Sequence, residues 1–235
     1  MGRAISLVLA MEGAKLVCRD LRELPNSEGY EADIKQATQD LIINKGGEAI
    51  FQLVDISIPS QIETADAKAI EKFGRLDILI NCAGYWAPFR EFVDEDDGLR
   101  GKGCSGREMG ESGSGSHSEH PLLCWTYCIC RRGCLFGNQS FYYSYDPAGV
   151  IDHAKDSINI NCVAPGAVQT GMARANFENA DIIKIMRNAT PWRRTGFAED
   201  IAGAVMLFCL PQSLWVPGHL LAVDGGMTLG VPAPS

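Results

Sequence analysis

The chain has 235 residues, 46% of them hydrophobic, and carries a formal net charge of -8. This length can enclose one sizeable core, so we expect a single domain over residues 1–235. The acidic balance, with no stripe of Lys or Arg, argues against nucleic-acid or lipid-headgroup binding and favours a small-molecule partner.

The first 12 residues offer only one apolar run, residues 4–11. This run is too short to span a bilayer, and acidic sequence without a cleavage site follows it. We therefore expect no signal peptide and no membrane span, and a cytoplasmic location.

The expected elements alternate between helix and strand along most of the chain. Helices are expected at 3–12, 33–45, 62–73, 180–187 and 199–210, and strands at 15–19, 49–54, 76–80, 158–163 and 220–223. Between the third of these strands and Ile151 neither periodicity is visible. Alternating strands and helices predict an α/β fold, a doubly wound and mostly parallel Rossmann-type sheet.

Nine cysteines fall into two groups. Cys18, Cys82, Cys162 and Cys209 sit in apolar segments, as small hydrophobic residues would. The other five lie between Cys104 and Cys134, near His117 and His120. Thiolates and imidazoles suit tetrahedral zinc, but the paired short-spaced knuckles of structural zinc sites are absent. No metal site is expected, and a zinc-binding insert remains a remote alternative.

Two carboxylates follow expected strands. Asp20 ends the first, where a Rossmann fold places an acidic group on the adenosine ribose, and Leu21 follows it rather than a base. This favours NAD over NADP, although Arg19 and Arg22 are close and acidic residues are common in turns. Asp55 follows the second strand, where its simplest role is to cap a loop.

Two further motifs carry a family resemblance. One is Asn81-Cys-Ala-Gly84, and the other is Asn161-Cys-Val-Ala-Pro-Gly-Ala-Val-Gln-Thr170. With the segments 191–203 and 218–226, they make the chain resemble the classical short-chain dehydrogenase/reductase family over roughly 1–93 and 149–230. The resemblance implies an NAD(P)-dependent dehydrogenase or reductase that interconverts a small-molecule alcohol and a ketone, usually as a homodimer or homotetramer.

The resemblance also assigns cofactor-binding residues. Asp55 corresponds to the aspartate of the adenine pocket, and the Pro-Gly loop to the segment that receives the nicotinamide carboxamide. The full set that we expect to bind NAD, or NADP, is Gly2, Asp20, Asp55, Asn81, Ala83, Gly84, Pro165, Gly166, Val168 and Thr170.

The family's catalytic Ser and Tyr-x3-Lys are not found at their usual spacing before Asn161. Those positions hold Leu122, Leu135 and Gln139, so we assign no catalytic residue in this chain. The family's opening strand and glycine-rich turn are also missing, because Gly2 aligns with the last glycine of that turn. We expect an incomplete sheet with two gaps, no regular strand over 97–148, and no activity of the chain as written.

The middle segment has a specific explanation. Codons can be chosen for 133–140 so that skipping one nucleotide reads Gly-Ala-Tyr-Ser-Ala-Thr-Lys, and for 117–123 so that it reads Ile-Val-Asn-Ile-Leu-Ser-Cys. Both strings have the family's pattern at the expected separation, so we interpret about 97–149 as translated out of frame. The alternative function is a non-catalytic Rossmann remnant or an interaction partner of intact homologues.

Overall fold

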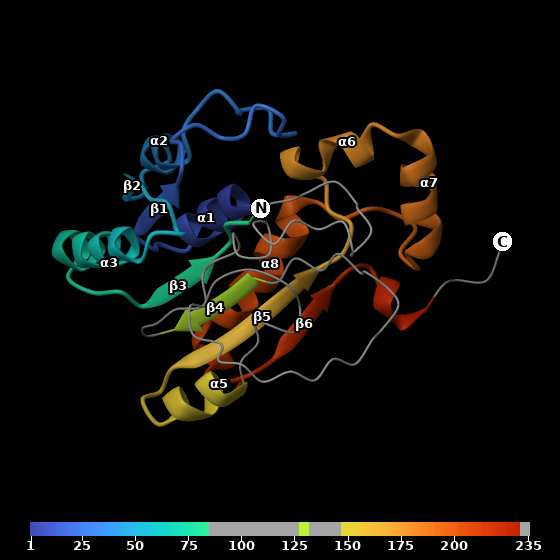
Figure 1. Ribbon diagram of the computed structural model, residues 1–235. Coiled ribbons are helices and arrows are strands. Elements are labelled where there is room, and N and C mark those ends of the chain that lie inside the picture. Colours follow the sequence, from blue (N-terminus) through green and yellow to red (C-terminus); the bar gives the residue numbers. More distant parts are fainter. Residues whose placement is uncertain (85–126, 132–146, 231–235) are drawn as a thin grey trace.

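The computed structural model describes residues 1–84, 127–131 and 147–230, in which helices and strands alternate (Figure 1). The α-helices are α1 (Gly2–Met11), α2 (Thr38–Asn44), α3 (Pro59–Phe73), α5 (Pro147–Ala154), α6 (Arg174–Phe177), α7 (Ala180–Ala189) and α8 (Ala198–Cys209). The strands are β1 (Leu16–Asp20), β2 (Ala49–Leu53), β3 (Ile78–Asn81), β4 (Tyr127–Arg131), β5 (Asn159–Pro165) and β6 (Leu220–Val223). Short 3₁₀ turns are η2 (Gly171–Ala173), η3 (Pro211–Ser213) and η4 (Met227–Leu229).

The strands form two sheets. β1 and β2 pair in parallel, and the second sheet has the order β3-β4-β5-β6. β4 runs antiparallel to both β3 and β5, whereas β5 and β6 are parallel. The predicted α/β class is therefore confirmed.

The main core lies between the four-stranded sheet and two helices that pack against each other, α1 and α8. Ile5 and Leu9 of α1 meet Ile201 and Val205 of α8 over the buried Val163 of β5. The neighbouring side chains of a strand point to opposite faces. Ile160 of β5 accordingly faces the other way, where it packs with Leu79 and with Val150 of α5. Both faces of this sheet are thus covered, and all seven residues of β5 are buried.

Most predicted boundaries agree with the structure within three residues, but α2 begins at Thr38 rather than at residue 33. Arg3 of α1 explains the difference. Its guanidinium donates to the carbonyl and the carboxylate of Asp33, at 3.0 and 2.9 Å, and to the carbonyl of Gln36 at 2.8 Å. The carbonyls of Asp33 and Gln36 thus accept from Arg3, and residues 32–35 form turns before the helix begins at Thr38. The short helices α5 and α6 were not predicted.

The prediction of no regular strand over 97–148 is wrong at β4. This strand lies in one of the two predicted gaps, with Ile129 between Ile80 of β3 and Asn161 of β5. Two facing strand edges leave rows of backbone donors and acceptors to be satisfied, and backbone pairing requires no alternating side-chain pattern. At the other predicted gap, no strand within the described residues joins β1 to β3.

Candidate functional site at the carboxyl edge

The carboxyl ends of the parallel strands lie at one edge of the molecule. The amide of Val54 donates to the carbonyl of Asp20 at 3.0 Å, which joins the ends of β1 and β2. Through β4, Asn81 of β3 is aligned with Cys162 of β5. α1 connects the two groups, because it packs against β1 and its first residue, Gly2, lies against Cys82. Open α/β sheets bind ligands at this edge.

Asp20 is exposed at this edge, and its carboxylate is only partly used. The amide of Leu21 donates to its Oδ1 atom at 2.7 Å, and no described residue donates to Oδ2. Arg19 is turned away from the edge, because its guanidinium forms a 2.6 Å ion pair with Asp66 of α3. The Asp20 carboxylate can therefore accept a hydrogen bond from a ribose hydroxyl, and the Arg19 guanidinium does not compete for it.

Asp55 takes part in a local turn. Its Oδ1 accepts from the hydroxyl and the amide of Ser57, at 2.7 and 2.9 Å, and these hydrogen bonds lower the pKa of the carboxyl. The Asp55 amide donates to Oε1 of Gln61, at 2.8 Å. The structure thus shows the loop-capping role, with the side chain fixed close to the end of β2.

The segment after β3 lies beside the start of α1. Asn81 ends the strand, Ala83 is exposed and Gly84 is partly buried. A Cβ atom built on Gly2 would lie 3.2 Å from Cys82 Sγ, so a larger residue would push the helix start away from β3. The first turn of α1 has no side-chain cap, and the free amides of such a turn suit a phosphate group.

The loop after β5 is held by the loop after β6. Pro165 is the last residue of β5, and a Cβ on Gly166 would lie 2.7 Å from Cα of Asp224. Glycine is needed here for the close approach of the Asp224 backbone. Val168 is buried and pairs with Gly196, and Thr170 precedes η2. No described residue bonds the Thr170 hydroxyl.

Asp224 was not among the predicted site residues, although it lies in the quoted segment 218–226. Partial burial opposes ionisation of Asp224, but a hydrogen bond from the Thr228 side chain, with those from the amides of Thr228 and Gly226 at 2.9 Å, outweighs it and holds its pKa below the ordinary value. The residue lines a hollow of about 600 Å³ together with Trp192, Thr228 and Leu229. The carboxylate therefore shapes the turn next to Gly166.

Asn161, in the most specific sequence motif, is a structural residue. Its side chain is 1% exposed, and its Oδ1 accepts from the amide of His219 at 2.8 Å. Asn159, two residues earlier, donates to the carbonyl of Leu214 at 2.9 Å. Both amides tie β5 to the chain that leads into β6, and so position the Pro-Gly loop.

These residues fit the two ends of a nicotinamide dinucleotide. Asp20 offers a carboxylate oxygen for the adenosine ribose, and Thr170 offers a hydroxyl after β5 for the carboxamide. The uncapped first turn of α1 lies beside the end of β3. The positions of the catalytic groups, Leu122, Leu135 and Gln139, lie outside the described residues, as does most of the Cys and His tract.

Within the described ranges, no helix has the length and apolar character needed to cross a membrane. Two family sequence profiles match the chain. The profile described as short chain dehydrogenase matches residues 1–98, and the one described as enoyl-(acyl carrier protein) reductase matches residues 150–228. The interval 99–149 lies outside both.

Individual proteins match over nearly the whole chain. An uncharacterized oxidoreductase of Thermotoga maritima is 27% identical, with 97% of this chain and 93% of the relative covered. The 7α-hydroxysteroid dehydrogenase of Escherichia coli is 28% identical, with 96% and 89% covered. The crystal structure of carveol dehydrogenase from Mycobacterium avium in complex with NAD has a similar fold, with a TM-score of 0.69, 20% identity, and 97% and 93% covered. The profiles, the relatives and the fold show that this chain belongs to the short-chain dehydrogenase/reductase family of NAD(P)-dependent oxidoreductases.

Proposed function

We propose that the carboxyl edge of this chain binds NAD in preference to NADP, and that the chain derives from an oxidoreductase of small-molecule alcohols and ketones. The observation that carries the proposal is the free carboxylate oxygen of Asp20 at the edge where β1, β3 and β5 end. The relatives support the substrate class, because one of them is a 7α-hydroxysteroid dehydrogenase and another is a 3-oxoacyl-[acyl-carrier-protein] reductase.

Different residues would bind different parts of the dinucleotide. Asp20 accepts hydrogen bonds from the adenosine ribose, and Asp55 with its fixed turn borders the adenine. Gly2, Asn81, Ala83 and Gly84 leave room for the middle of the dinucleotide, while Pro165, Gly166, Val168 and Thr170 hold the carboxamide end. A bound nicotinamide would supply or accept the hydride of the reaction.

We further propose that the chain as written performs no turnover. The positions of the Ser, Tyr and Lys hold Leu122, Leu135 and Gln139, none of which exchanges a proton with a substrate oxygen. The second candidate is therefore a non-catalytic dinucleotide-binding protein that pairs with intact homologues. Sequencing the transcript across codons 90–150 distinguishes a faulty gene record from a real non-catalytic product.

Assembly and location follow the family in this proposal. We propose one domain over residues 1–235, a homodimer or homotetramer, and a cytoplasmic protein. Native mass spectrometry of the purified chain, alone and mixed with an intact family member, tests the assembly. A chain that stays monomeric and does not associate with the intact family member would contradict the proposed assembly.

Calorimetric titration with NAD tests the binding site. We expect the wild-type chain to bind NAD and the Asp20→Asn variant to bind about tenfold more weakly, because a neutral amide oxygen replaces a charged acceptor. Asp40→Asn, an exposed change on α2, is the matched control and should bind as the wild type does. Equal affinity of all three proteins would contradict the assignment of Asp20.

A further inference from the structure

Two segments that are far apart in the sequence meet above the carboxyl edge. One is the segment after β1, residues 26–30, and the other is η2 with α6, after β5. In Figure 1 the loop that follows β1 extends from the side of α2 until it reaches α6. Asp20 precedes the first segment and Thr170 precedes the second. The contact therefore links the part of the edge that holds Asp20 to the part that holds Thr170.

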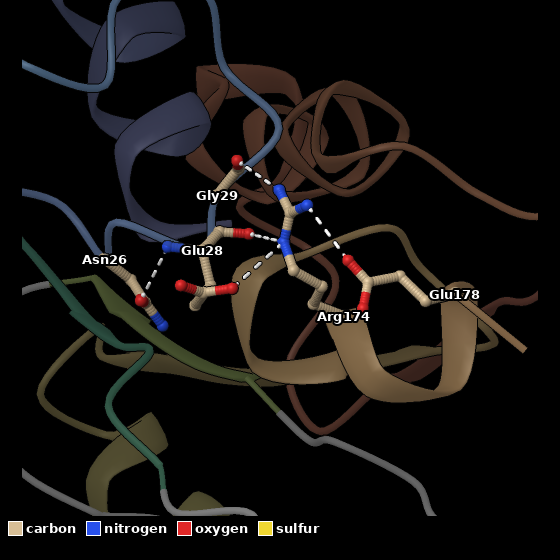
Figure 2. A network of polar contacts seen from close by, with 5 residues as sticks. All are labelled: Asn26, Glu28, Gly29, Arg174 and Glu178. Carbon is tan, nitrogen blue, oxygen red and sulfur yellow. Dashed lines mark hydrogen bonds and ion pairs between the residues drawn. The ribbon is translucent and has the colours of Figure 1, made fainter.

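Arg174, the first residue of α6, makes this contact (Figure 2). Its Nε atom donates to the carbonyl of Glu28 at 2.6 Å, and a terminal nitrogen donates to the carbonyl of Gly29 at 2.8 Å. The guanidinium also lies over the ring of Tyr30, 4.4 Å from its centroid. One planar cation therefore binds three consecutive residues of the other segment, a geometry that lysine cannot reproduce.

The surroundings of Arg174 strengthen the contact. Its side chain is 28% exposed, and Glu28 and Glu178 lie 3.4 and 3.3 Å away as exposed ion-pair partners. Tyr30 in turn packs edge-on against the buried Phe177 of α6, with 6.5 Å between ring centroids. Since exposed ion pairs contribute little, the two backbone carbonyls and the Tyr30 ring carry most of the interaction.

A second, independent feature brings the two backbones together. A Cβ atom built on Gly171 would lie 2.8 Å from the amide nitrogen of Gly29 and 2.9 Å from the carbonyl carbon of Glu28. These are backbone atoms, which cannot rotate aside. Any side chain at residue 171 would separate the segments even with Arg174 in place.

We propose that Arg174 is a positioning residue that fastens segment 26–30 to α6 as a strap over the carboxyl edge, and that this strap controls entry and release of the dinucleotide. The second half of this inference depends on the proposed dinucleotide site, and the first half does not. The strap acts by holding the loop beyond Asp20 against the segment beyond Thr170, so a ligand bound between these residues leaves only when the contact opens.

Hydrogen exchange of the ligand-free chain tests the strap. Arg174→Ala should exchange about tenfold faster at 26–30 than the wild type, the factor expected for losing a hydrogen bond to a charged donor. Arg174→Lys should lie between the two. Gly171→Ala should act in the same direction with Arg174 intact, and Arg187→Ala, an exposed arginine on α7, should change nothing. Unchanged exchange at 26–30 in Arg174→Ala would overturn the strap.

Stopped-flow fluorescence of bound NADH tests the control of release. We expect Arg174→Ala to raise both the association and the dissociation rate about tenfold, with a smaller change in Kd, because an opening step is removed. If a variant exchanges faster at 26–30 but releases NADH at the wild-type rate, the gating role is overturned. A wild-type chain that binds no NADH would refute the proposed function and its gating, while the exchange experiment would still decide on the strap.

Discussion

At the scale of single residues, the charge of Asp20 at the carboxyl edge is the basis of the proposed preference for NAD. Asp20 keeps one carboxylate oxygen free, and Arg19 is held by Asp66 at 2.6 Å. A 2′-phosphate would therefore meet a negative charge without compensation from Arg19. Arg22 is the remaining nearby cation, and it lies two residues beyond Asp20 in the exposed loop.

Replacement of Asp20 should change this preference. The wild-type chain is expected to bind NAD about tenfold more tightly than NADP, and Asp20→Ser should remove most of the difference by removing the repulsion. Parallel titrations of both proteins with NAD and NADP measure this difference in affinity. Tighter binding of NADP by the wild type would show that Arg22 outweighs Asp20.

A second residue pair controls stability near the start of α8. Asp200 receives two hydrogen bonds from Arg194, at 2.7 and 2.9 Å, and one from the amide of Phe197, at 2.8 Å. The bond from Arg194 is the main reason why the pKa of Asp200 is lowered. A pKa that is lower in the folded state gives stability above the unfolded value of about 3.9, and this stability is lost as the pH falls through the folded value.

Asp200→Asn should therefore lower the free energy of unfolding by about 1 kcal/mol at neutral pH, and the melting temperature by about 2–4 °C. The difference from the wild type should shrink as the pH falls below the unfolded value and through the lowered pKa of the folded carboxyl, because the wild-type carboxylate then takes up a proton. Urea unfolding at neutral pH and over a series of acidic pH values is the measurement. Glu199→Gln, in the same helical turn, is the control, and a deficit independent of pH would contradict the role of the charge.

At the scale of elements, β4 is the feature that the sequence did not predict. Because β4 pairs with β5, it should protect particular backbone amides of β5 from exchange with solvent. Neighbouring backbone amides of a strand point to opposite sides. The amide of Cys162 donates to the carbonyl of His219 on the β6 side, so the amides of Asn161 and Val163 face β4.

We expect the amides of Asn161 and Val163 to exchange with solvent as slowly as that of Cys162, because β4 pairs with them. Amide exchange followed by nuclear magnetic resonance resolves these neighbours, and Cys162 is the internal control. Fast exchange at Asn161 and Val163 beside a slow Cys162 would show an open edge next to β5.

The elements also show what the sequence can and cannot predict. β6 was predicted from its continuous apolar run, residues 220–223, and β5 from apolar residues that recur at positions 158, 160, 162 and 163. β4 could not be predicted, since its place follows from two open edges that come from distant parts of the chain. The same holds for Arg174, whose partners are backbone carbonyls of a distant segment, whereas the Asp224 carboxylate binds amides within its own turn. Asp20 and the Pro-Gly loop were predicted because a known strand order fixes their edge.

At the scale of the whole molecule, the chain combines a family fold with a central segment that lacks the family's catalytic residues. We expect no measurable oxidation or reduction of a panel of alcohols and ketones with NAD or NADP. Losing the general acid alone costs about 10²–10⁴ in rate. Steady turnover above the blank by purified protein, monitored through nicotinamide absorbance, would contradict this expectation.

A hydrogen-exchange footprint of NAD on the purified chain tests the dinucleotide site most directly. We expect protection at the carboxyl edge, in peptides that contain Asp20, Asp55 and the segment 165–170, with no change in α3 or α5. Protection confined to other surfaces, or no protection at saturating NAD, would contradict a dinucleotide site at this edge.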